Sequence, residues 1–312
     1  MADTTHDIPS QGEMPYHTPA LLHECIEALD IKPGGIYVDA TFGGGGHSRA
    51  ILASLDSEGR LFGFDQDSDA MANALPDERF TFVRSNFRYM PNFMRYHGIE
   101  KVDGILADLG VSFHHFDDAA RGFSFRADAP LDMRMNPDAI TTAADVVNDA
   151  DEETLRSIFR TGTDLRDTNR IVRAILTARK ERRIDTTSQL VEVVSKCLNP
   201  KSVKQDLAQI FQAFRIYVNH ELDALVEFLH NAQKILKPGG RLAVITYHSL
   251  EDRLVKALLK TGNTEGQLEK DFFGNVSTPW RLITRTPITP SAEEIERNPR
   301  SRSAKLRVAE LK

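Results

Sequence analysis

The sequence lacks the features of disulfide-linked, secreted and membrane-spanning proteins. It holds two cysteines, Cys25 and Cys197, too few for a disulfide framework and without the spacing of a metal site. No apolar run approaches the ~20 residues that a membrane helix needs. The polar stretch from Met1 to Gln11 has no signal-peptide core. We therefore expect a protein of the reducing cytoplasm that does not enter a membrane.

A surplus of basic residues is also missing. The 39 lysines and arginines are outnumbered by 45 aspartates and glutamates, so the formal net charge is −6. Such a chain is not drawn to nucleic acid by its overall charge, and any role of that kind must depend on local basic patches. The length of 312 residues is enough for one large domain or two smaller ones.

Glycine, by contrast, is concentrated in one place. The β-rich run GIYV at 35–38 leads into DATFGGGGHS at 39–48, and a helix-like run follows over 49–55. Strand, glycine turn and helix form the first unit of nucleotide-binding α/β domains. A merely flexible loop is the weaker interpretation, because a strand and an acid precede the glycines and a helix follows them.

The spacing of the glycines selects among nucleotide ligands. A dinucleotide loop would have its third glycine where Ser48 stands, and a phosphate loop would end in a Gly-Lys pair that is missing. The next predicted strand, over 60–64, ends at Asp65. A carboxylate about 20 residues beyond the glycines holds the ribose hydroxyls in such domains. S-adenosylmethionine has a ribose and no pyrophosphate. It therefore fits a loop that lacks both the dinucleotide pattern and the phosphate-loop pattern.

Strand-like and helix-like runs alternate through the first third of the chain, which predicts a parallel sheet. Besides the first two strands, we expect strands over 80–83 and 102–108 and helices over 20–29 and 67–75, the first of these helices capped by Thr18. A long irregular segment then runs from Leu109 to Pro137. Only helices follow it, predicted over 143–148, 151–161, 167–183 and 187–198.

The second half returns to the α/β pattern. One long helix is predicted over 206–236, a buried strand over 241–247 and a helix over 249–260, and the tail has two strand-like runs around a loop rich in proline and arginine. We predict a Rossmann-like α/β sheet of an S-adenosylmethionine-dependent methyltransferase with a helical insertion domain. Its parts are residues 1–137 and 206–312, with the substrate-recognising insertion at 138–205.

Ligands of open α/β sheets bind at the carboxyl ends of the strands. Five groups stand at those ends: Asp39 with the glycine loop, Asp65, Phe87, Asp108, and the run Tyr247-His248-Ser249. Asp39 either binds the ligand or holds the turn, and we expect Asp65 to bind the ribose. Phe87 either packs in the core or lies beside the adenine.

The irregular segment holds the densest mixture of aromatic, arginine and aspartate residues, at 117–126 and 130–135. A nucleobase pocket needs stacking faces, planar donors and edge acceptors of this kind. The alternative, an ordered loop tied by Asp–Arg pairs, leaves its length unexplained. His114 and His115 are adjacent and point apart in an extended segment, so we predict no metal.

Eight motifs in order resemble the RsmH (MraW) family of bacterial methyltransferases, which modify the exocyclic N4 of a cytidine in 16S ribosomal RNA. They are HTP at 17–19, TFGGGGHS at 41–48, DLGVS at 108–112, RGFSF at 121–125, PLDMRM at 130–135, FQAFRIYVN at 211–219, HSLEDR at 248–253 and NPRSRS at 298–303. The resemblance covers the chain from about Tyr16 to Leu311.

This resemblance implies a set of S-adenosylmethionine contacts. They are Gly45, Gly46, His47, Asp65, Phe87 and Asp108. A further contact, usually a glutamine in a Ser-Ser-Pro-Gln-Leu-Asp string, falls on His115, because the string here reads SFHHFD at 112–117. The family's Thr-Arg pair before the Phe-Gln motif falls on DLAQI at 206–210, which has no arginine.

Methylation of an exocyclic amine sets the demands on catalytic residues. The sulfonium carbon is already electrophilic, whereas the N4 lone pair is delocalised into the ring. The protein must therefore orient the amine and take up positive charge as the bond forms. Asp108 is the first candidate for this role, Asp132 the second and His248 the third. A base in duplex RNA would have to be flipped or already unpaired.

Two basic patches are predicted to contact phosphate. The first, on the strongest helix of the insertion, is Arg166, Arg170, Arg173, Arg179, Lys180, Arg182 and Arg183. The second, near the tail, is Arg297, Arg300, Arg302, Lys305 and Arg307. The first patch by itself is better explained by a solvated helix face. Two patches on an acidic chain favour contacts with RNA, which weaken steeply with salt.

The leading hypothesis is methylation of a cytidine N4 in 16S ribosomal RNA of the small ribosomal subunit, in the cytoplasm. A small-molecule methyltransferase of the same fold would be insensitive to salt and have no affinity for RNA. A non-catalytic ribosome-assembly factor would bind RNA and no cofactor, which the glycine loop and Asp65 speak against. The sequence leaves a homodimer open.

Overall fold

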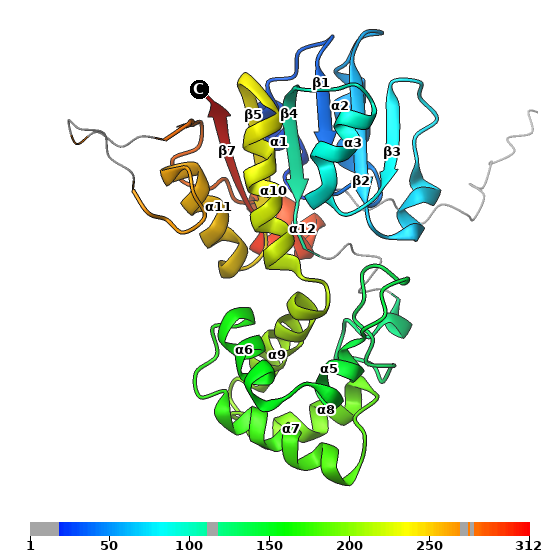
Figure 1. The fold of residues 1–312 in the computed structure, drawn as a ribbon, viewed down its shortest axis with the longest axis vertical. Helices are drawn as coiled ribbons and strands as arrows, with labels where there is room; N and C mark the ends of the chain where they lie inside the picture. The colour runs from blue at the N-terminus through cyan, green and yellow to red at the C-terminus, as the bar shows by residue number, and fades with distance from the viewer. Residues whose placement is uncertain (1–18, 111–117, 269–273, 275–277) are drawn as a thin grey trace, which may run out of the picture.

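A central sheet of seven strands organises the computed structural model, which describes residues 19–110, 118–268, 274 and 278–312. The strands are β1 (Ile36–Asp39), β2 (Arg60–Asp65), β3 (Phe80–Arg84), β4 (Val102–Asp108), β5 (Leu236–Thr246), β6 (Trp280–Leu282) and β7 (Lys305–Leu311). They lie in the order β3-β2-β1-β4-β5-β7-β6. The first five are parallel, and β7 runs antiparallel to β5 and β6 (Figure 1).

Helices bury both faces of this sheet. On one face lie α3 (Met90–Tyr96), α10 (Glu221–Ile235) and α11 (Ser249–Thr261); on the other lie α1 (Leu22–Leu29) and α2 (Gly46–Ala53). Within β4, Ile105 and Ala107 join the first core, whereas Leu106 between them joins the second. Strands buried on both sides need apolar residues at consecutive positions, which is why these runs are continuous instead of alternating.

All the strands predicted for the parallel sheet are present. Their ends shift by one residue at most, except that β5 begins at Leu236, five residues before the predicted start. The run predicted as a helix over 67–75 is the 3₁₀ helix η1 (Ser68–Asn73), which Asp67 caps by accepting from the backbone of Asp69. The tail contains a further helix, α12 (Ala292–Arg297), where we expected only a loop; Ser291 caps it. The predicted cap of the first helix, Thr18, lies outside the described residues.

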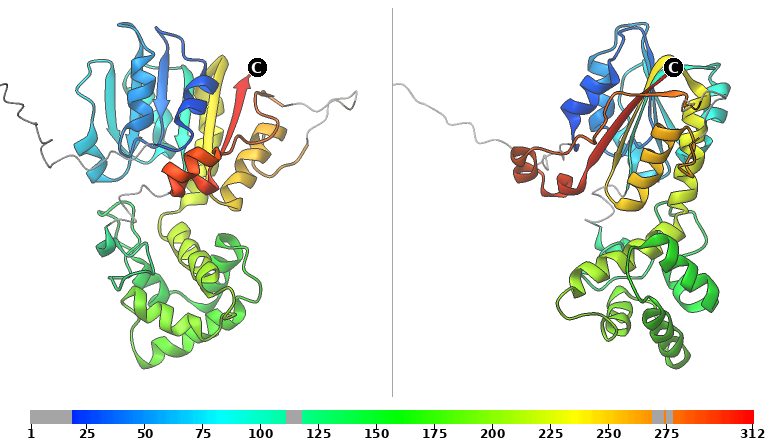
Figure 2. Two further views of the ribbon diagram at one scale, coloured as in Figure 1. Left: turned by 180° about the vertical axis from the view of Figure 1, so that it is seen from behind. Right: turned by 90° about the vertical axis from the view of Figure 1, so that its left-hand side faces the viewer.

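A further hydrophobic core, separate from the two on the faces of the sheet, lies among five helices. They are α5 (Ala143–Asp149), α6 (Glu152–Gly162), α7 (Asn169–Glu181), α8 (Thr187–Ser195) and α9 (Val203–Val218). This helical unit lies beyond the edge at which the parallel strands end (Figures 1 and 2). It extends past the predicted limits of 138 and 205, because Leu131 and Met133 before it and Phe211 and Phe214 on α9 are buried in the same core.

The single helix predicted over 206–236 is wrong. Helix α9 ends at Val218 and α10 begins at Glu221. Between them, His220 takes a left-handed conformation with φ of 51°. On one side of the break α9 packs in the helical unit, and on the other α10 packs on the sheet (Figure 2). The apolar period continues through the break, so the pattern alone did not reveal the change of domain. Within the described residues, no helix has both the length and the apolar character required to cross a membrane.

The side chain of Asn219 ties the two ends of the helical unit together at this break. Its Oδ1 accepts from the backbone N–H of Met135 at 2.7 Å, and its Nδ2 donates to the carbonyl of Met133 at 2.8 Å. Met133 is fully buried and has a φ of 61°, a left-handed conformation that a non-glycine residue adopts only when its surroundings hold it. Asn219 therefore fixes the path by which the chain enters the unit.

We expect Asn219→Ala to lower the free energy of unfolding by about 1–3 kcal/mol, because a buried donor and a buried acceptor lose their partner. Urea denaturation measures this. Asn199→Ala is the matched control, since the side chain of Asn199 accepts only from the nearby backbone of Lys201 at the surface. Equal losses in the two variants would contradict the role given to Asn219.

Candidate functional site

The glycine loop forms a turn into α2 that side chains would obstruct. Gly45 has a φ of +73°, and a Cβ there would lie 2.8 Å from the ring of Phe42. A Cβ on Gly46 would lie 2.8 Å from Pro19. Glycine is thus required by conformation at the first position and by space at both. Within this turn Gly44 is exposed and Gly43 and Gly46 are partly exposed, whereas Gly45 is buried.

Asp39, for which two roles were open, holds this loop. Its side chain is 1% exposed, and its two oxygens accept from Ser48 Oγ at 2.7 Å and from the N–H of Thr41 at 3.1 Å. Burial raises the pKa of Asp39 to about 6, against the opposing effect of those hydrogen bonds. Both carboxylate oxygens are accounted for within the turn, which favours the structural role.

Asp65 lies where a ribose-binding carboxylate is expected. One oxygen accepts from the N–H of Gly43 at 2.8 Å and the other from the N–H of Asp67 at 2.9 Å. The residue is half-buried. A carboxylate oxygen accepts more than one hydrogen bond, so these contacts are compatible with binding two hydroxyls. The same carboxylate thereby joins the glycine loop to the end of β2.

Phe87 opens the short helix η2 (Phe87–Tyr89) beyond β3 and is partly buried. Its ring contacts Phe228 of α10 edge-on, with centroids 5.1 Å apart. One side of the ring therefore belongs to the core. The contact with Phe228 supports packing in the core. The ring also lies at the edge of the sheet where the parallel strands end, so a contact with the adenine stays open.

Asp108 ends β4 in a polar cluster that draws on three other elements. Its backbone N–H donates to Thr41 Oγ1 at 2.6 Å, and its Oδ1 accepts from the hydroxyl of Tyr247 at 2.9 Å. His47 Nδ1 lies 3.9 Å from Oδ2. Burial raises the pKa of Asp108 to about 6, although the hydrogen bond from Tyr247 acts in the opposite direction.

The orientation of His47 follows from its other nitrogen. Its Nε2 lies 3.1 Å from the carbonyl of Ala20, and only a protonated nitrogen donates to a carbonyl oxygen. Burial lowers the pKa of His47, so the ring favours its neutral form with Nδ1 unprotonated. His47 is 4% exposed and anchors the start of α2 against the residues before α1.

His248, the third catalytic candidate, is the N-cap of α11. Its Nδ1 accepts from the N–H of Glu251 at 3.4 Å, and its Nε2 lies 3.1 Å from Glu251 Oε1. Glu251, His248 and Glu221 carry possible metal-ligand atoms within 4.8 Å of one another. Arg215, however, donates to both oxygens of Glu221 at 2.9 and 3.0 Å. The cluster is therefore a compensated ion-pair network, and we assign no metal to it.

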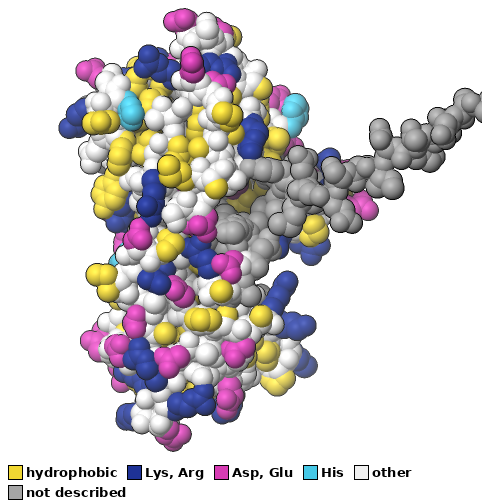
Figure 3. Space-filling model, turned by 90° about the vertical axis from the view of Figure 1, so that its right-hand side faces the viewer, with side chains coloured by type: hydrophobic (Ala, Val, Ile, Leu, Met, Phe, Trp, Pro, Cys, Tyr) yellow, Lys and Arg dark blue, Asp and Glu magenta, His cyan; other side chains and the backbone are white. Residues whose placement is uncertain are grey.

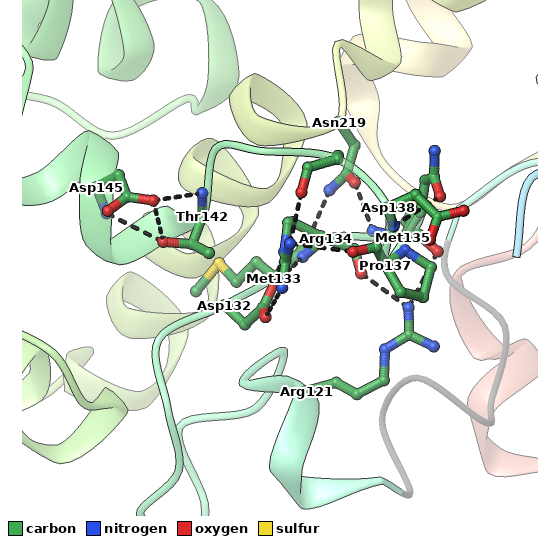
Figure 4. Close-up of polar contacts among 12 residues, drawn as sticks. Arg121, Asp132, Met133, Arg134, Met135, Pro137, Asp138, Thr142, Asp145 and Asn219 are labelled. Atoms are coloured by element: carbon green, nitrogen blue, oxygen red, sulfur yellow. Dashed lines mark hydrogen bonds and ion pairs between the residues drawn. The ribbon is translucent and has the colours of Figure 1, made fainter.

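Asp132, the second catalytic candidate, is paired within its own segment. Both its oxygens accept from the guanidinium of Arg134 at 2.7 Å, and its carbonyl accepts from the N–H of Ala143 (Figure 4). Arg134 also donates to the carbonyls of Pro137 and Ala139. Among the contacts of the described residues, none joins Asp132 to Asp108. This bidentate pairing supports a structural role more directly than a catalytic one.

Arg121 joins the same segment to the turn that follows β2. It lies at the end of η3 (Ala119–Arg121), and its guanidinium donates to Asp67 Oδ2 at 2.7 Å. It also donates to the carbonyls of Arg134 and Met135 at 2.8 and 3.0 Å. The arginine side chain is 13% exposed and that of Asp67 is 5% exposed.

The described part of the irregular segment is thus an ordered loop tied by Asp–Arg pairs, as the alternative reading had it. Phe123 is buried in the helical core, and Phe125 packs edge-on against Phe211. The predicted cofactor contact His115 and the rest of 111–117 lie outside the described residues. The length of the loop is explained by its share in the core of the helical unit.

The two basic patches are smaller than expected. Arg166 precedes α7 and is not on it, because Asp167 takes a left-handed φ of 54° and the helix begins at Asn169. Arg179 donates to two backbone carbonyls, and Arg183 pairs with three aspartates. In the tail, Arg307 is 9% exposed and pairs with Asp252.

Other members of the patches remain at the surface, namely Arg166, Arg170, Arg173, Lys180, Arg182, Arg297, Arg300 and Arg302, and Lys305 is partly exposed. Arg166 and Arg170 line a cavity of about 270 Å³ on the helical unit, beside Asp167 and Asp206. On the face drawn in Figure 3, acidic and basic side chains are interspersed. Positive charge is therefore confined to local groups of arginine and lysine side chains, as expected for a chain of net negative charge.

The strand order, the glycine loop and Asp65 at the end of β2 together define the class of protein. A parallel sheet with an antiparallel β7 beside β5, bearing these groups at its carboxyl ends, is that of a Rossmann-like S-adenosylmethionine-dependent methyltransferase. The chain belongs to the MraW methylase family, whose model matches residues 14–312.

Relatives match the chain over nearly its whole length. Ribosomal RNA small subunit methyltransferase H of Phocaeicola vulgatus is 58% identical, over 96% of this chain and 99% of that protein. The protein of the same name from Bacteroides thetaiotaomicron is 57% identical, over 97% and 99%. A solved rRNA methylase from Streptococcus thermophilus covers 97% of this chain and 99% of its own at 13% identity, with a TM-score of 0.41.

We expect Arg121→Met to lower the free energy of unfolding by about 3–5 kcal/mol, because it removes the cation from a buried ion pair. Arg84→Met is the matched control. Arg84 also links the sheet to the segment before the helical unit, through Asp138, but that pair is exposed and contributes about 1 kcal/mol or less.

Urea denaturation measures the free energy of unfolding of both single variants and of the double variant Arg121→Met, Asp67→Asn. The comparison separates the contribution of the ion pair from that of the other contacts of Arg121. The double variant is expected to recover part of the loss, because the carboxylate charge is removed together with the guanidinium. Losses of the same small size for Arg121→Met and Arg84→Met would show that the buried pair does not hold the two parts together.

Proposed function

We propose that this chain transfers a methyl group from S-adenosylmethionine to the exocyclic N4 of a cytidine in 16S ribosomal RNA of the small ribosomal subunit. The observation that carries the substrate is the identity of 57–58% with relatives named Ribosomal RNA small subunit methyltransferase H, over nearly their whole length. Because bacterial ribosomes assemble in the cytoplasm, we place the reaction there.

The cofactor would be held by Gly45, Gly46, His47, Asp65 and Phe87. The fit rests on the loop that excludes side chains at Gly45 and Gly46, and on the half-buried carboxylate of Asp65 beside it. When bound, the cofactor supplies an electrophilic methyl group whose carbon–sulfur bond breaks with the electron pair staying on sulfur. The ring of Phe87, packed on Phe228, offers a fixed face to the adenine.

Asp108 is the residue we assign to the amine. Its Oδ2 accepts a hydrogen from N4, which turns the nitrogen lone pair toward the methyl group and stabilises the positive charge that develops. As N4 forms its new bond to carbon, it loses one proton, which Asp108 takes up. A carboxylate whose pKa is raised to about 6 is a stronger base than an exposed aspartate, which suits this step.

RNA contacts are assigned to the helical unit and the tail. Arg166 and Arg170 line a hollow, and Arg300 and Arg302 lie on η4 (Pro299–Ser303), which follows α12 near the carboxyl edge of the sheet (Figures 1 and 2). Guanidinium groups suit phosphate because they donate in pairs. His248 and Asp132 act in this scheme as positioning residues of α11 and of the segment before α5.

The test is transfer of a labelled methyl group to small ribosomal subunits that lack their own modification, followed by nucleoside analysis. We expect N4-methylcytidine with the wild type, and a loss of at least about 100-fold in kcat for Asp108→Asn, because the amide does not accept a proton. Asp132→Asn is the matched carboxylate-to-amide control and is expected to retain most of the kcat, with lower stability.

Two outcomes would overturn the proposal. If the wild type binds the cofactor, labels no subunit and methylates a small molecule with no dependence on salt, the substrate is wrong, since phosphate contacts make RNA binding fall steeply with salt. If it binds RNA and no cofactor, the protein is an assembly factor. A loss in Asp132→Asn as large as that in Asp108→Asn would reassign the amine-orienting role.

A further inference from the structure

We propose that Tyr247 is a positioning residue for methyl transfer: its hydroxyl holds Oδ1 of Asp108, so that Oδ2 is the oxygen that receives the hydrogen of the substrate amine. This inference rests on the proposed function and adds to it a residue that follows a different strand, β5. The run Tyr247-His248-Ser249 stood among the strand ends in the sequence, but only the fold shows which of its members reaches the carboxylate.

The contact follows from the pairing of β4 with β5. Asp108 lies beside Ile245 in the register, and the N–H of Leu109 donates to the carbonyl of Ile245 at 3.0 Å. Tyr247 is two residues beyond Ile245 and directly follows the last residue of β5, and its hydroxyl reaches Asp108 Oδ1 at 2.9 Å. Its own N–H donates to Glu251 Oε2 at 2.9 Å. The tyrosine is thus fixed at its backbone by α11 and at its ring tip by Asp108.

The other groups facing Asp108 do not replace this donor. His47 presents its unprotonated Nδ1 toward Oδ2 at 3.9 Å. Asp39 and Glu251 are both acidic and raise the pKa of Asp108, and the thiol of Cys25 is buried with a raised pKa of its own. Within the described ranges, Tyr247 is the only side chain that donates a hydrogen bond to the Asp108 carboxylate.

The two oxygens of Asp108 are therefore not equivalent. Oδ1 is occupied by a hydroxyl, whereas among the described residues Oδ2 meets only the lone pair of His47. A hydrogen donated by the substrate amine would give Oδ2 the hydrogen-bond partner that the described side chains do not provide. Because the hydrogen bond from Tyr247 favours the ionised carboxylate, it also lowers the pKa of Asp108 from the value that burial alone would give.

Tyr247→Phe removes the hydroxyl and keeps the ring. We expect kcat to fall by about tenfold near pH 6, with the KM values for cofactor and RNA nearly unchanged. The acid limb of the kcat profile should move up by about one pH unit, because the carboxylate loses the donor that favours its ionised form. In an Asp108→Asn background the same substitution should have no further effect on kcat, since it acts through that carboxylate.

A second readout needs no cofactor and no RNA. The contact stabilises the ionised form of Asp108, so its contribution is present above the folded-state pKa and is lost as the pH falls below it. The deficit in Tm of Tyr247→Phe should therefore be larger at pH 8 than at pH 5. Tyr37→Phe is the control, because the buried hydroxyl of Tyr37 accepts from the N–H of Lys32 and makes no hydrogen bond to a carboxylate of the described residues.

The inference is overturned if Tyr247→Phe leaves the acid limb in place and its Tm deficit is the same at both pH values. It is overturned equally by a higher KM for the cofactor with kcat unchanged, which would make the tyrosine part of the cofactor site. Failure of the proposed function is distinguishable, because a wild type that transfers no methyl group to RNA still permits the comparison of Tm against pH.

Discussion

The buried ion pair between Arg121 and Asp67 is the contact on which the arrangement of the two parts depends. Asp67 belongs to the turn that follows β2, two residues after the carboxylate proposed to hold the ribose. Arg121 belongs to the loop that leads into the helical unit, and it also holds two carbonyls of that loop. A charge removed from water needs a partner and its remaining donors satisfied, and this geometry supplies both. This side chain thereby links the turn after β2 to the loop that leads into the helical unit.

Electrostatics at the carboxyl edge of the sheet is governed by desolvation. Burial raises the pKa of both Asp39 and Asp108 to about 6, although each accepts hydrogen bonds that favour its charge. At Asp39 the consequence is structural, since both oxygens close the glycine turn. At Asp108 only Oδ1 accepts a hydrogen bond from a side chain of the described residues. Its other oxygen, Oδ2, can therefore accept a hydrogen bond from a ligand.

Local patterns predicted the parallel strands, the glycine turn and the position of Asp65, because each depends on residues that are close in sequence. The break at Asn219 was missed, since the apolar period of α9 runs on into α10 while the two helices serve different cores. Arg121 and Tyr247 were also not assigned their roles. Their partners are 54 and 139 residues away, and nothing in a local pattern specifies which carboxylate a distant side chain meets. Asp132 was predicted as the second catalytic candidate, whereas in the structure it pairs with Arg134, only two residues along the chain.

The tie made by Asn219 has a consequence for how the chain folds. Neighbouring strands β4 and β5 are separated in sequence by residues 109–235, and closing so long a loop costs conformational entropy before any strand pairing compensates for it. The helical unit has a core of its own, and Asn219 holds its exit within hydrogen-bonding distance of its entry at Met135. Once that unit is folded, the connection between the strands is short in space. The order of events that this favours, helices before the closure of the sheet, is the one in which local contacts form first and the most distant pairing last.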